Sequence, residues 1–237
     1  MSDLRKDTRN WYSEYYLKNG QDRNNIRTNP EVLFQTLANE ASVVNVARNV
    51  ALPLEGVSVL DVGCGAGGNF FQLLRLGVCP DNLSGIDILQ ENIEHARLLF
   101  PQVKLVCADA GSMPFEDEKF DLVSEFTMFA TLPGETLAAK IAFEMLRVCR
   151  SGGYLLLVDW RTPKPGDHNY SALNMARLER LFGLGSSTEL VAISNGALIP
   201  PLGRFLSKYL PSMYFPVSAV FPFLVGQVAY LLRKRVA

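Results

Sequence analysis

Residues 59–69 read VLDVGCGAGGN, a short apolar run typical of a buried strand followed at once by a glycine-rich turn. Glycine has no Cβ, so the backbone of such a turn can bend tightly and come close to a ligand. Gly63, Gly65 and Gly68 also fit the G-x-G-x-x-G spacing of dinucleotide sites. The stretch therefore predicts a strand, a cofactor-binding turn and a helix, and leaves the class of cofactor open.

The carboxylate of Asp61 bears on the class of cofactor. It precedes Gly63 by two positions, where the pyrophosphate of a dinucleotide would be held and would be repelled by a negative charge. An ammonium group would be attracted there instead, and S-adenosylmethionine carries one on its amino-acid tail and has no phosphate. We therefore expect S-adenosylmethionine. A nucleotide-dependent oxidoreductase and a cofactor-binding module without catalysis stay open as alternatives.

Two more carboxylates follow the next two expected strands. Asp87 closes the second strand, at the position where an acid accepts hydrogen bonds from ribose hydroxyls. Asp109 closes the third strand, where its carboxylate could receive the adenine amino group. The structural alternative for both acids is a helix N-cap or a turn.

Short β-rich apolar runs alternate with helix-like stretches from Pro53 onward. We expect strands over residues 57–62, 83–88, 103–107, 120–126 and 154–159, and helices over residues 69–77, 90–100 and 135–149. Strict alternation of this kind predicts an α/β fold, with a mostly parallel sheet covered by helices on both faces. Residues 1–52 have helical spacing and predict an N-terminal helical cap.

Several motifs together resemble the class I S-adenosylmethionine-dependent methyltransferases, and among them the type 11 group. They are the strand and D-x-G-x-G-x-G turn of residues 59–67, the acid of residues 85–87, and residues 109–123, which read DAGSMPFEDEKFDLV. Residues 146–155 are similar to the helix, turn and fifth strand of that family. The resemblance covers roughly residues 55–160 and implies a Rossmann-like, seven-stranded, mostly parallel sheet.

The resemblance also implies which residues contact the cofactor. They are Gly63, Gly65 and Gly67 at its amino-acid end, Asp87 at the ribose, Ile88 at the adenine face, Asp109 and Ala110 at the adenine edge, and Glu125 and Phe126 at the methyl-donor end.

Two runs near the C-terminus would complete the sheet that the resembled fold requires. Residues 189–193 would be the sixth strand and residues 225–232 the seventh, with an apolar insertion, residues 194–224, between them. A parallel sixth strand would start this insertion on the ligand side, so we expect it to hang over the acceptor pocket together with the N-terminal tyrosines. The expected organisation is a single domain with a helical cap at 1–52, a cofactor-binding core at 53–193, the insertion at 194–224 and the last strand at 225–237.

Methyl transfer from a sulfonium depends mainly on alignment and on a pocket poor in water. A hydroxyl acceptor also benefits from a base, and the candidates are His168 and Asp159, which lie at the carboxyl end of the fifth strand. With Asp167 they could hold a divalent cation, but the sequence offers no matching ligand geometry and we expect no metal. Many relatives carry a histidine after the fourth strand, whereas residues 126–131 hold none, which weakens a base assigned by analogy.

Composition excludes several classes of protein. The 23 basic and 24 acidic residues give a net charge of −1, which favours no nucleic-acid partner. Four widely spaced cysteines argue against a zinc site or a disulfide framework and favour a cytoplasmic protein, and the charged N-terminus predicts no signal peptide. Between Glu189 and Arg233 only Arg204 and Lys208 are charged, yet the apolar run over residues 217–232 is too short to span a bilayer.

The aromatic composition of the two caps predicts an O-methyltransferase for a sugar or glycan-type acceptor, because aromatic rings stack on pyranose faces. The C-terminal region also loosely resembles methyltransferases of bacterial surface-polysaccharide synthesis. The alternative acceptor is a lipophilic quinone or another lipid. The insertion could bury itself against the domain, meet the inner face of a membrane or a lipid-linked acceptor, or form a homodimer.

Overall fold

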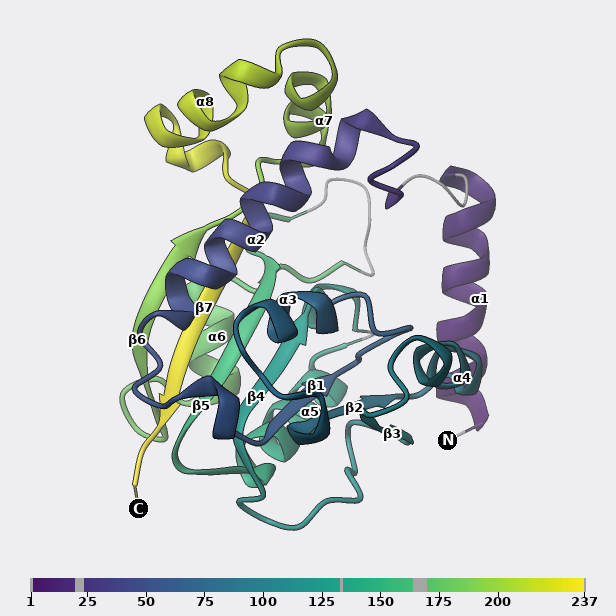
Figure 1. Ribbon diagram of the computed structural model, residues 1–237, viewed down its shortest axis with the longest axis vertical. Coiled ribbons are helices and arrows are strands. Elements are labelled where there is room, and N and C mark those ends of the chain that lie inside the picture. Colours follow the sequence, from purple (N-terminus) through teal and green to yellow (C-terminus); the bar gives the residue numbers. More distant parts are fainter. Residues whose placement is uncertain (1, 20–23, 133, 164–169, 237) are drawn as a thin grey trace.

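The computed structural model describes residues 2–19, 24–132, 134–163 and 170–236. Within these ranges a seven-stranded sheet has the strand order β3-β2-β1-β4-β5-β7-β6 (Figure 1). The strands are β1 (Val59–Val62), β2 (Leu83–Asp87), β3 (Lys104–Cys107), β4 (Phe120–Phe126), β5 (Cys149–Trp160), β6 (Thr188–Asn195) and β7 (Gln227–Lys234). Strands β1 to β5 pair in parallel, and β7 is antiparallel to both β5 and β6, so β6 runs parallel to the first five strands. The predicted α/β class with a mostly parallel sheet is confirmed.

The helices form two layers over this sheet and a separate group at one end. They are α1 (Ser2–Asn19), α2 (Leu33–Ala47), α3 (Phe70–Arg75), α4 (Gln90–Leu99), α5 (Glu135–Val148), α6 (Met175–Phe182), α7 (Pro200–Tyr209) and α8 (Tyr214–Val220). Side chains of α5 and α6 pack into one hydrophobic core, and those of α3 and α4 pack into the other. In β1, Leu60 and Val62 face the first core and Val59 faces the second, as the two-residue period of a strand requires.

The insertion between β6 and β7 comprises α7, α8 and the short 3-10 turns η6 (Pro211–Met213) and η7 (Pro222–Leu224). It packs against α2 and the turn η2 (Pro30–Val32) that precedes it (Figure 1). Ser207 Oγ makes two bonds across this contact, accepting from the backbone N–H of Phe34 at 3.0 Å and donating to the carbonyl of Pro30 at 2.9 Å. Among the described residues, no helix is both long and apolar enough to cross a membrane.

Candidate functional site

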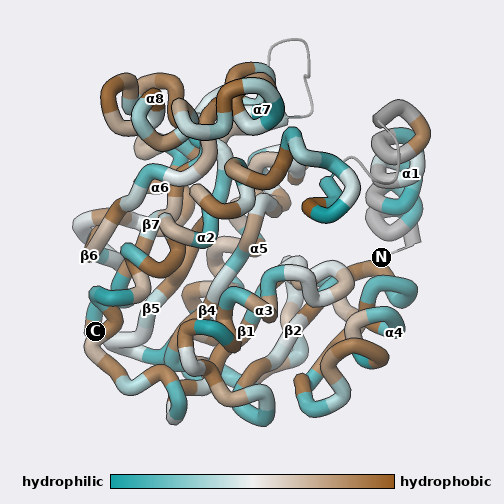
Figure 2. Tube along the Cα trace, turned by 45° about the horizontal axis from the view of Figure 1, so that its top comes forward, coloured by the Kyte–Doolittle hydropathy of each residue, from teal (hydrophilic) through white to brown (hydrophobic). Residues whose placement is uncertain are grey.

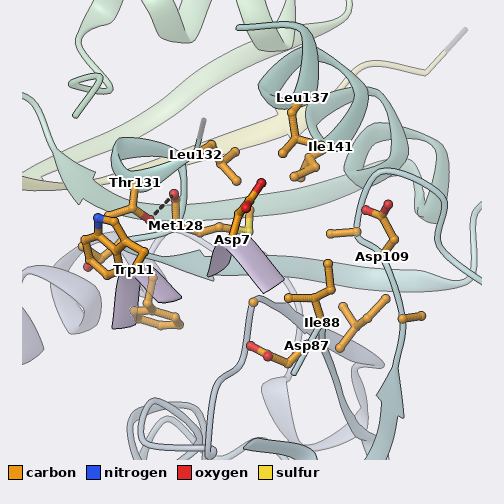
Figure 3. Close-up of a pocket in the computed structure, with 16 residues that line it drawn as sticks. Asp7, Trp11, Asp87, Ile88, Asp109, Met128, Thr131, Leu132, Leu137 and Ile141 are labelled. Atoms are coloured by element: carbon orange, nitrogen blue, oxygen red, sulfur yellow. Dashed lines mark hydrogen bonds between the residues drawn. The ribbon is translucent and has the colours of Figure 1, made fainter. Parts of the chain in front are cut away.

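A cavity of about 280 Å³ lies at the carboxyl ends of β1, β2 and β4, the edge at which ligands bind in parallel α/β sheets (Figure 3). Helix α1 contributes to its wall from the other side. The lining residues are Asp7, Trp11, Gly63, Ile86, Asp87, Ile88, Ala108, Asp109, Ala110, Phe126, Thr127, Met128, Thr131, Leu132, Leu137 and Ile141.

The backbone of the glycine turn after β1 adopts a conformation that residues with a Cβ rarely adopt. Gly63, Gly65 and Gly67 have φ angles of 70°, 54° and 84°, in the left-handed region that favours glycine. A Cβ on Gly67 would lie 2.9 Å from ring atoms of Phe70 and Phe100, whereas a Cβ on Gly65 would meet nothing within 4 Å. Gly63 lines the cavity, and the other two glycines shape the turn behind it.

Asp87 ties the turn to the start of α4 while it lines the cavity. Its Oδ2 accepts from the backbone N–H of Gly65 at 3.0 Å, and its Oδ1 accepts from the N–H of Leu89 at 2.8 Å and from Asn92 Nδ2 at 3.1 Å. Burial raises the pKa of this carboxyl. A carboxylate has about four acceptor sites, so three donors leave room for about one more, such as a ribose hydroxyl.

Asp109 lies across the cavity from the glycine turn. Its Oδ1 accepts from the backbone N–H of Gly111 at 2.8 Å, a local turn that fixes the carboxylate. Its neighbours in the chain, Ala108 and Ala110, and Ile88 contribute apolar surface to the same cavity. Asp109, like Asp87, therefore both stabilises a local turn and lines the cavity.

Asp61 lies beneath the turn rather than in the cavity wall. Only 1% of its surface is exposed, and its Oδ1 accepts from Ser124 Oγ at 2.7 Å. Its Oδ2 is buried without a partner among the described residues. Burial raises the pKa of Asp61 to about 7. An orphaned carboxylate oxygen under the glycine turn fits the ammonium group of an amino-acid tail, because a cation would satisfy both its charge and its hydrogen bond.

Glu125 and Asp159, predicted at the methyl-donor end and as a base, lie inside the fold. Both side chains are completely buried, and neither lines the cavity. Glu125 Oε2 accepts from the N–H of Met128 at 2.9 Å, and Asp159 Oδ2 accepts from the N–H of Ala130 at 2.9 Å. Both oxygens of Asp159 are bonded to backbone N–H groups, a geometry that does not support a role as a base. Phe126, which was predicted with Glu125 at the methyl-donor end, lies in the cavity wall.

The other candidate base, His168, and its neighbour Asp167 lie outside the described residues. Within the described ranges, no cluster of three or more His, Cys, Asp or Glu side chains could hold a metal ion. The described lining of the cavity holds aspartates but neither histidine nor lysine.

The N-terminal helix α1, expected over the acceptor pocket, contributes two residues to the cavity wall that the sequence did not single out as site residues. Asp7 and Trp11 are four residues apart, so they share one face of the helix and both line the cavity (Figure 3). Arg9 points elsewhere and pairs with Glu91 of α4, Nε to Oε1 at 2.8 Å. The aromatic cluster of this helix was expected at the pocket through its tyrosines, whereas its residues that line the cavity are Asp7 and Trp11. The insertion over residues 194–224, expected to cover the pocket, contributes no lining residue.

The comparisons with known proteins concern mainly the middle of the chain. Residues 60–157 match a family model described as a methyltransferase domain. The chain is 36% identical over 110 residues to phthiotriol/phenolphthiotriol dimycocerosates methyltransferase 1 of Mycobacterium ulcerans, which covers 46% of this chain and 39% of that protein. It is also 36% identical over 109 residues to the 2-methyl-6-phytyl-1,4-hydroquinone methyltransferase of Synechocystis, over 44% and 32% of the two chains. The matches thus span well under two thirds of these relatives.

Solved structures extend the likeness to the fold. Geranyl diphosphate C-methyltransferase of Streptomyces coelicolor, solved with S-adenosyl-L-homocysteine, has a TM-score of 0.60 at 13% identity, covering 83% of this chain and 77% of that one. The [4+2]-cyclase SpnF has a TM-score of 0.59 at 20% identity, over 84% and 82%. At these identities the likeness concerns the fold alone, and a cyclase on the same fold shows that chemistry has to be argued from the site.

Proposed function

Because residues 60–157 match a family model of a methyltransferase domain, we propose that this protein is an S-adenosylmethionine-dependent methyltransferase that methylates an apolar small molecule of the lipid or prenylated-quinol class. The observation that carries the proposal is the composition of the cavity. The wall that α1, α5, the end of β4 and the segment after it form is rich in apolar side chains (Figure 3). They are Trp11, Phe126, Met128, Leu132, Leu137 and Ile141, and the polar residues beside them are Asp7, Thr127 and Thr131. The two relatives named above for lipid and hydroquinone acceptors support the same class.

The residues divide the work of binding. Asp61 would hold the ammonium group of the cofactor, Asp87 a ribose hydroxyl, and Asp109 with its apolar neighbours the adenine. S-adenosylmethionine supplies an activated methyl group on a sulfonium, a cation that needs no acid to leave. The protein's part is to align the acceptor and to keep water out, which the apolar wall does.

A sugar or glycan-type acceptor, as predicted from the sequence, is the second candidate. Trp11 and Phe126 favour it, because both aromatic side chains lie in the cavity wall and such rings stack on pyranose faces. The two candidates differ in how many hydroxyl groups the pocket has to bind, and the described wall offers more apolar than polar surface for that task.

A radiolabelled methyl-transfer screen distinguishes them. The protein is incubated with methyl-labelled cofactor and, in separate reactions, prenylated hydroquinones, long-chain alcohols, sugar nucleotides and lipid-linked glycans. We expect label in the prenylated hydroquinone or lipid arms. Label confined to the sugar nucleotides would establish the second candidate, and binding of S-adenosylhomocysteine with no transfer in any arm would contradict both and favour a non-catalytic module.

The insertion suggests where such an acceptor would be met. No acidic residue occurs between positions 190 and 237, and α7 and α8 include apolar segments, brown in Figure 2. The exposed apolar side chains of this region are Phe205, Tyr209, Leu210, Met213, Phe215, Val220, Phe221 and Phe223. An exposed apolar and aromatic surface on a segment without acidic residues suits the headgroup boundary of a bilayer, so this surface is proposed to contact a membrane.

Flotation with vesicles of anionic and zwitterionic phospholipid tests the membrane contact. The wild type is expected to float, and the double variant Phe221→Ser/Phe223→Ser is expected to stay in the dense fraction. Leu98→Ser is the matched control. Leu98 lies on α4 and is 82% exposed, so this substitution removes an exposed apolar side chain far from the insertion in sequence. A wild type that never floats excludes the contact, and a dimer in light scattering that the double variant abolishes would assign the surface to a second copy.

A further inference from the structure

The segment that follows β4 carries part of the cavity wall on an unusual backbone. Thr127, Met128 and Thr131 all line the cavity. Thr127 has a φ of 63°, in the left-handed region that a β-branched residue rarely adopts. Such a conformation persists only where the surroundings hold it. The bonds that hold residues 127–131 therefore decide where this wall lies.

Two buried carboxylates supply such bonds from neighbouring strands. Glu125 of β4 is paired in register with Leu157 of β5, so Asp159 lies only two residues further along the adjacent strand. Glu125 accepts from the N–H of Met128, and Asp159 accepts from the N–H of Ala130. Both acids thus hold the backbone of the same segment, and both also interact with the N–H of Phe129 between these two residues.

We propose that Glu125 and Asp159 are positioning residues for methyl transfer, which act by holding residues 127–131 against the cavity. The proposal rests on the function proposed above for its catalytic meaning. The placement of the segment itself can be measured without any acceptor, so a failure of one proposal is separable from a failure of the other.

The two acids use their oxygens differently. Asp159 uses both, because its Oδ1 also accepts from the N–H of Trp160 at 2.7 Å. Glu125 uses Oε2 alone, and its buried Oε1 has no partner among the described residues. A carboxamide keeps one acceptor oxygen and replaces the other with a donor. Asparagine at position 159 therefore cannot keep both bonds, whereas glutamine at position 125 can keep its single bond.

The charges around the pair favour an uncharged Glu125. Burial, and then the nearby carboxylates of Asp159 and Asp61, raise the pKa of Glu125 well above its usual range. The positive charge of Arg177 on α6 lowers the pKa of Asp159, against the effect of burial. Arg177 Nη1 also donates to the carbonyl of Phe129 at 3.0 Å. Glutamine at position 125 thus resembles the protonated acid both in charge and in its bond.

Hydrogen–deuterium exchange of peptides covering residues 126–132 tests the placement in four variants. We expect Asp159→Asn and Glu125→Ala to exchange at least tenfold faster than the wild type in this segment, and Glu125→Gln to stay within threefold. Thr127→Gly, which relieves the backbone conformation without touching either acid, is expected to loosen the same peptides and serves if Asp159→Asn does not fold.

Methyl transfer to whichever probe of the screen is labelled completes the test. Asp159→Asn and Glu125→Ala are expected to lower kcat/KM for that acceptor at least tenfold, and Glu125→Gln to retain at least a third of it. Equal rates of hydrogen–deuterium exchange in Asp159→Asn and Glu125→Gln would contradict the proposed difference between the two acids. Loosened peptides with an unchanged kcat/KM would overturn the positioning role.

Discussion

The cavity has two walls that are built in different ways. The sheet wall is fixed by short-range bonds, for example those that join Asp87 to the N–H groups of Gly65 and Leu89. The helical wall is α1, which brings Asp7 and Trp11 over the cavity and whose ion pair with the core, Arg9 to Glu91, lies at the surface. From this difference we expect the sheet wall to bind the cofactor in a fixed geometry and α1 to adjust more readily to what lies beneath it.

The largest expected effect tests the rigidity of the sheet wall. Gly67→Ala adds a Cβ at a φ of 84° and only 2.9 Å from two phenylalanine rings, so strain and overpacking together should cost about 2–5 kcal/mol of stability. Gly65→Ala is the matched control, since it has the strain but open space, and should cost about 1–2 kcal/mol. Urea unfolding measures both. Equal losses would mean that the rings yield and that this wall is less rigid than its bonds suggest.

The next effect concerns the charge beneath the glycine turn. Asp61→Asn should weaken binding of S-adenosylhomocysteine by about 1–3 kcal/mol, which is about five- to 150-fold, because the ammonium group loses an ionised partner. With the pKa of Asp61 near 7, the wild-type affinity should rise from pH 6 to pH 8 as the carboxyl ionises. Isothermal calorimetry across this range should show a much flatter profile for the variant. An unchanged affinity would remove Asp61 from the cofactor site.

Asp61 also predicts how the stability of the ligand-free protein changes with pH, and this change is opposite in sign to that of the affinity. Its folded pKa of about 7 lies above the ordinary value of 3.8, so its contribution to stability is greatest below pH 4 and is lost as the pH rises through 7. The ligand-free wild type should therefore lose stability between pH 5 and pH 8 relative to Asp61→Asn. Melting temperatures measured for both proteins across this range test the sign, and parallel curves would contradict it.

The sheet wall could be predicted from sequence because its determinants are local. Asp87 and Asp109 follow strands, parallel strands end at one edge, and the glycine turn identifies which edge binds a ligand. The inward direction of Asp159 could not be read in the same way. It lies near a strand end, where a polar side chain is often exposed, yet β5 continues to Trp160 and the acid bonds to backbone inside the fold.

The helical parts depended on long-range packing that no local pattern encodes. The insertion starts on the ligand side, as predicted, but Ser207 and its neighbours join it to η2 and α2 rather than to the cavity. Of the two segments expected over the pocket, α1 alone contributes lining residues, Asp7 and Trp11. Its four-residue spacing predicts that Asp7 and Trp11 share a face, but not which surface that face meets.

A smaller effect on cofactor binding is expected from Trp11, the aromatic residue that α1 contributes to the cavity. Trp11 lines the cavity and is one of two tryptophans, so its fluorescence should change when S-adenosylhomocysteine binds. Trp11→Ala should weaken that binding only about three- to tenfold, because a partly buried side chain on an adjustable wall loses less contact than a fully buried one. Trp11→Phe is the matched control and should keep most of the affinity. A loss as large as that of Asp61→Asn would show that α1 is as much a part of the fixed site as the sheet.

The smallest expected effect lies in the ion pair that connects α1 to α4. The side chains of Arg9 and Glu91 are 62% and 49% exposed, so water and salt screen their attraction. Arg9→Ala, Glu91→Ala and the double variant should each change the dissociation rate of S-adenosylhomocysteine less than about threefold at low salt, and even less in 0.5 M sodium chloride. Stopped-flow displacement followed through Trp11 gives these rates, and the cycle isolates the pair from each side chain's own effect. A large coupling that survives high salt would mean that α1 is held as firmly as the strand ends, because only a pair protected from solvent keeps its strength there.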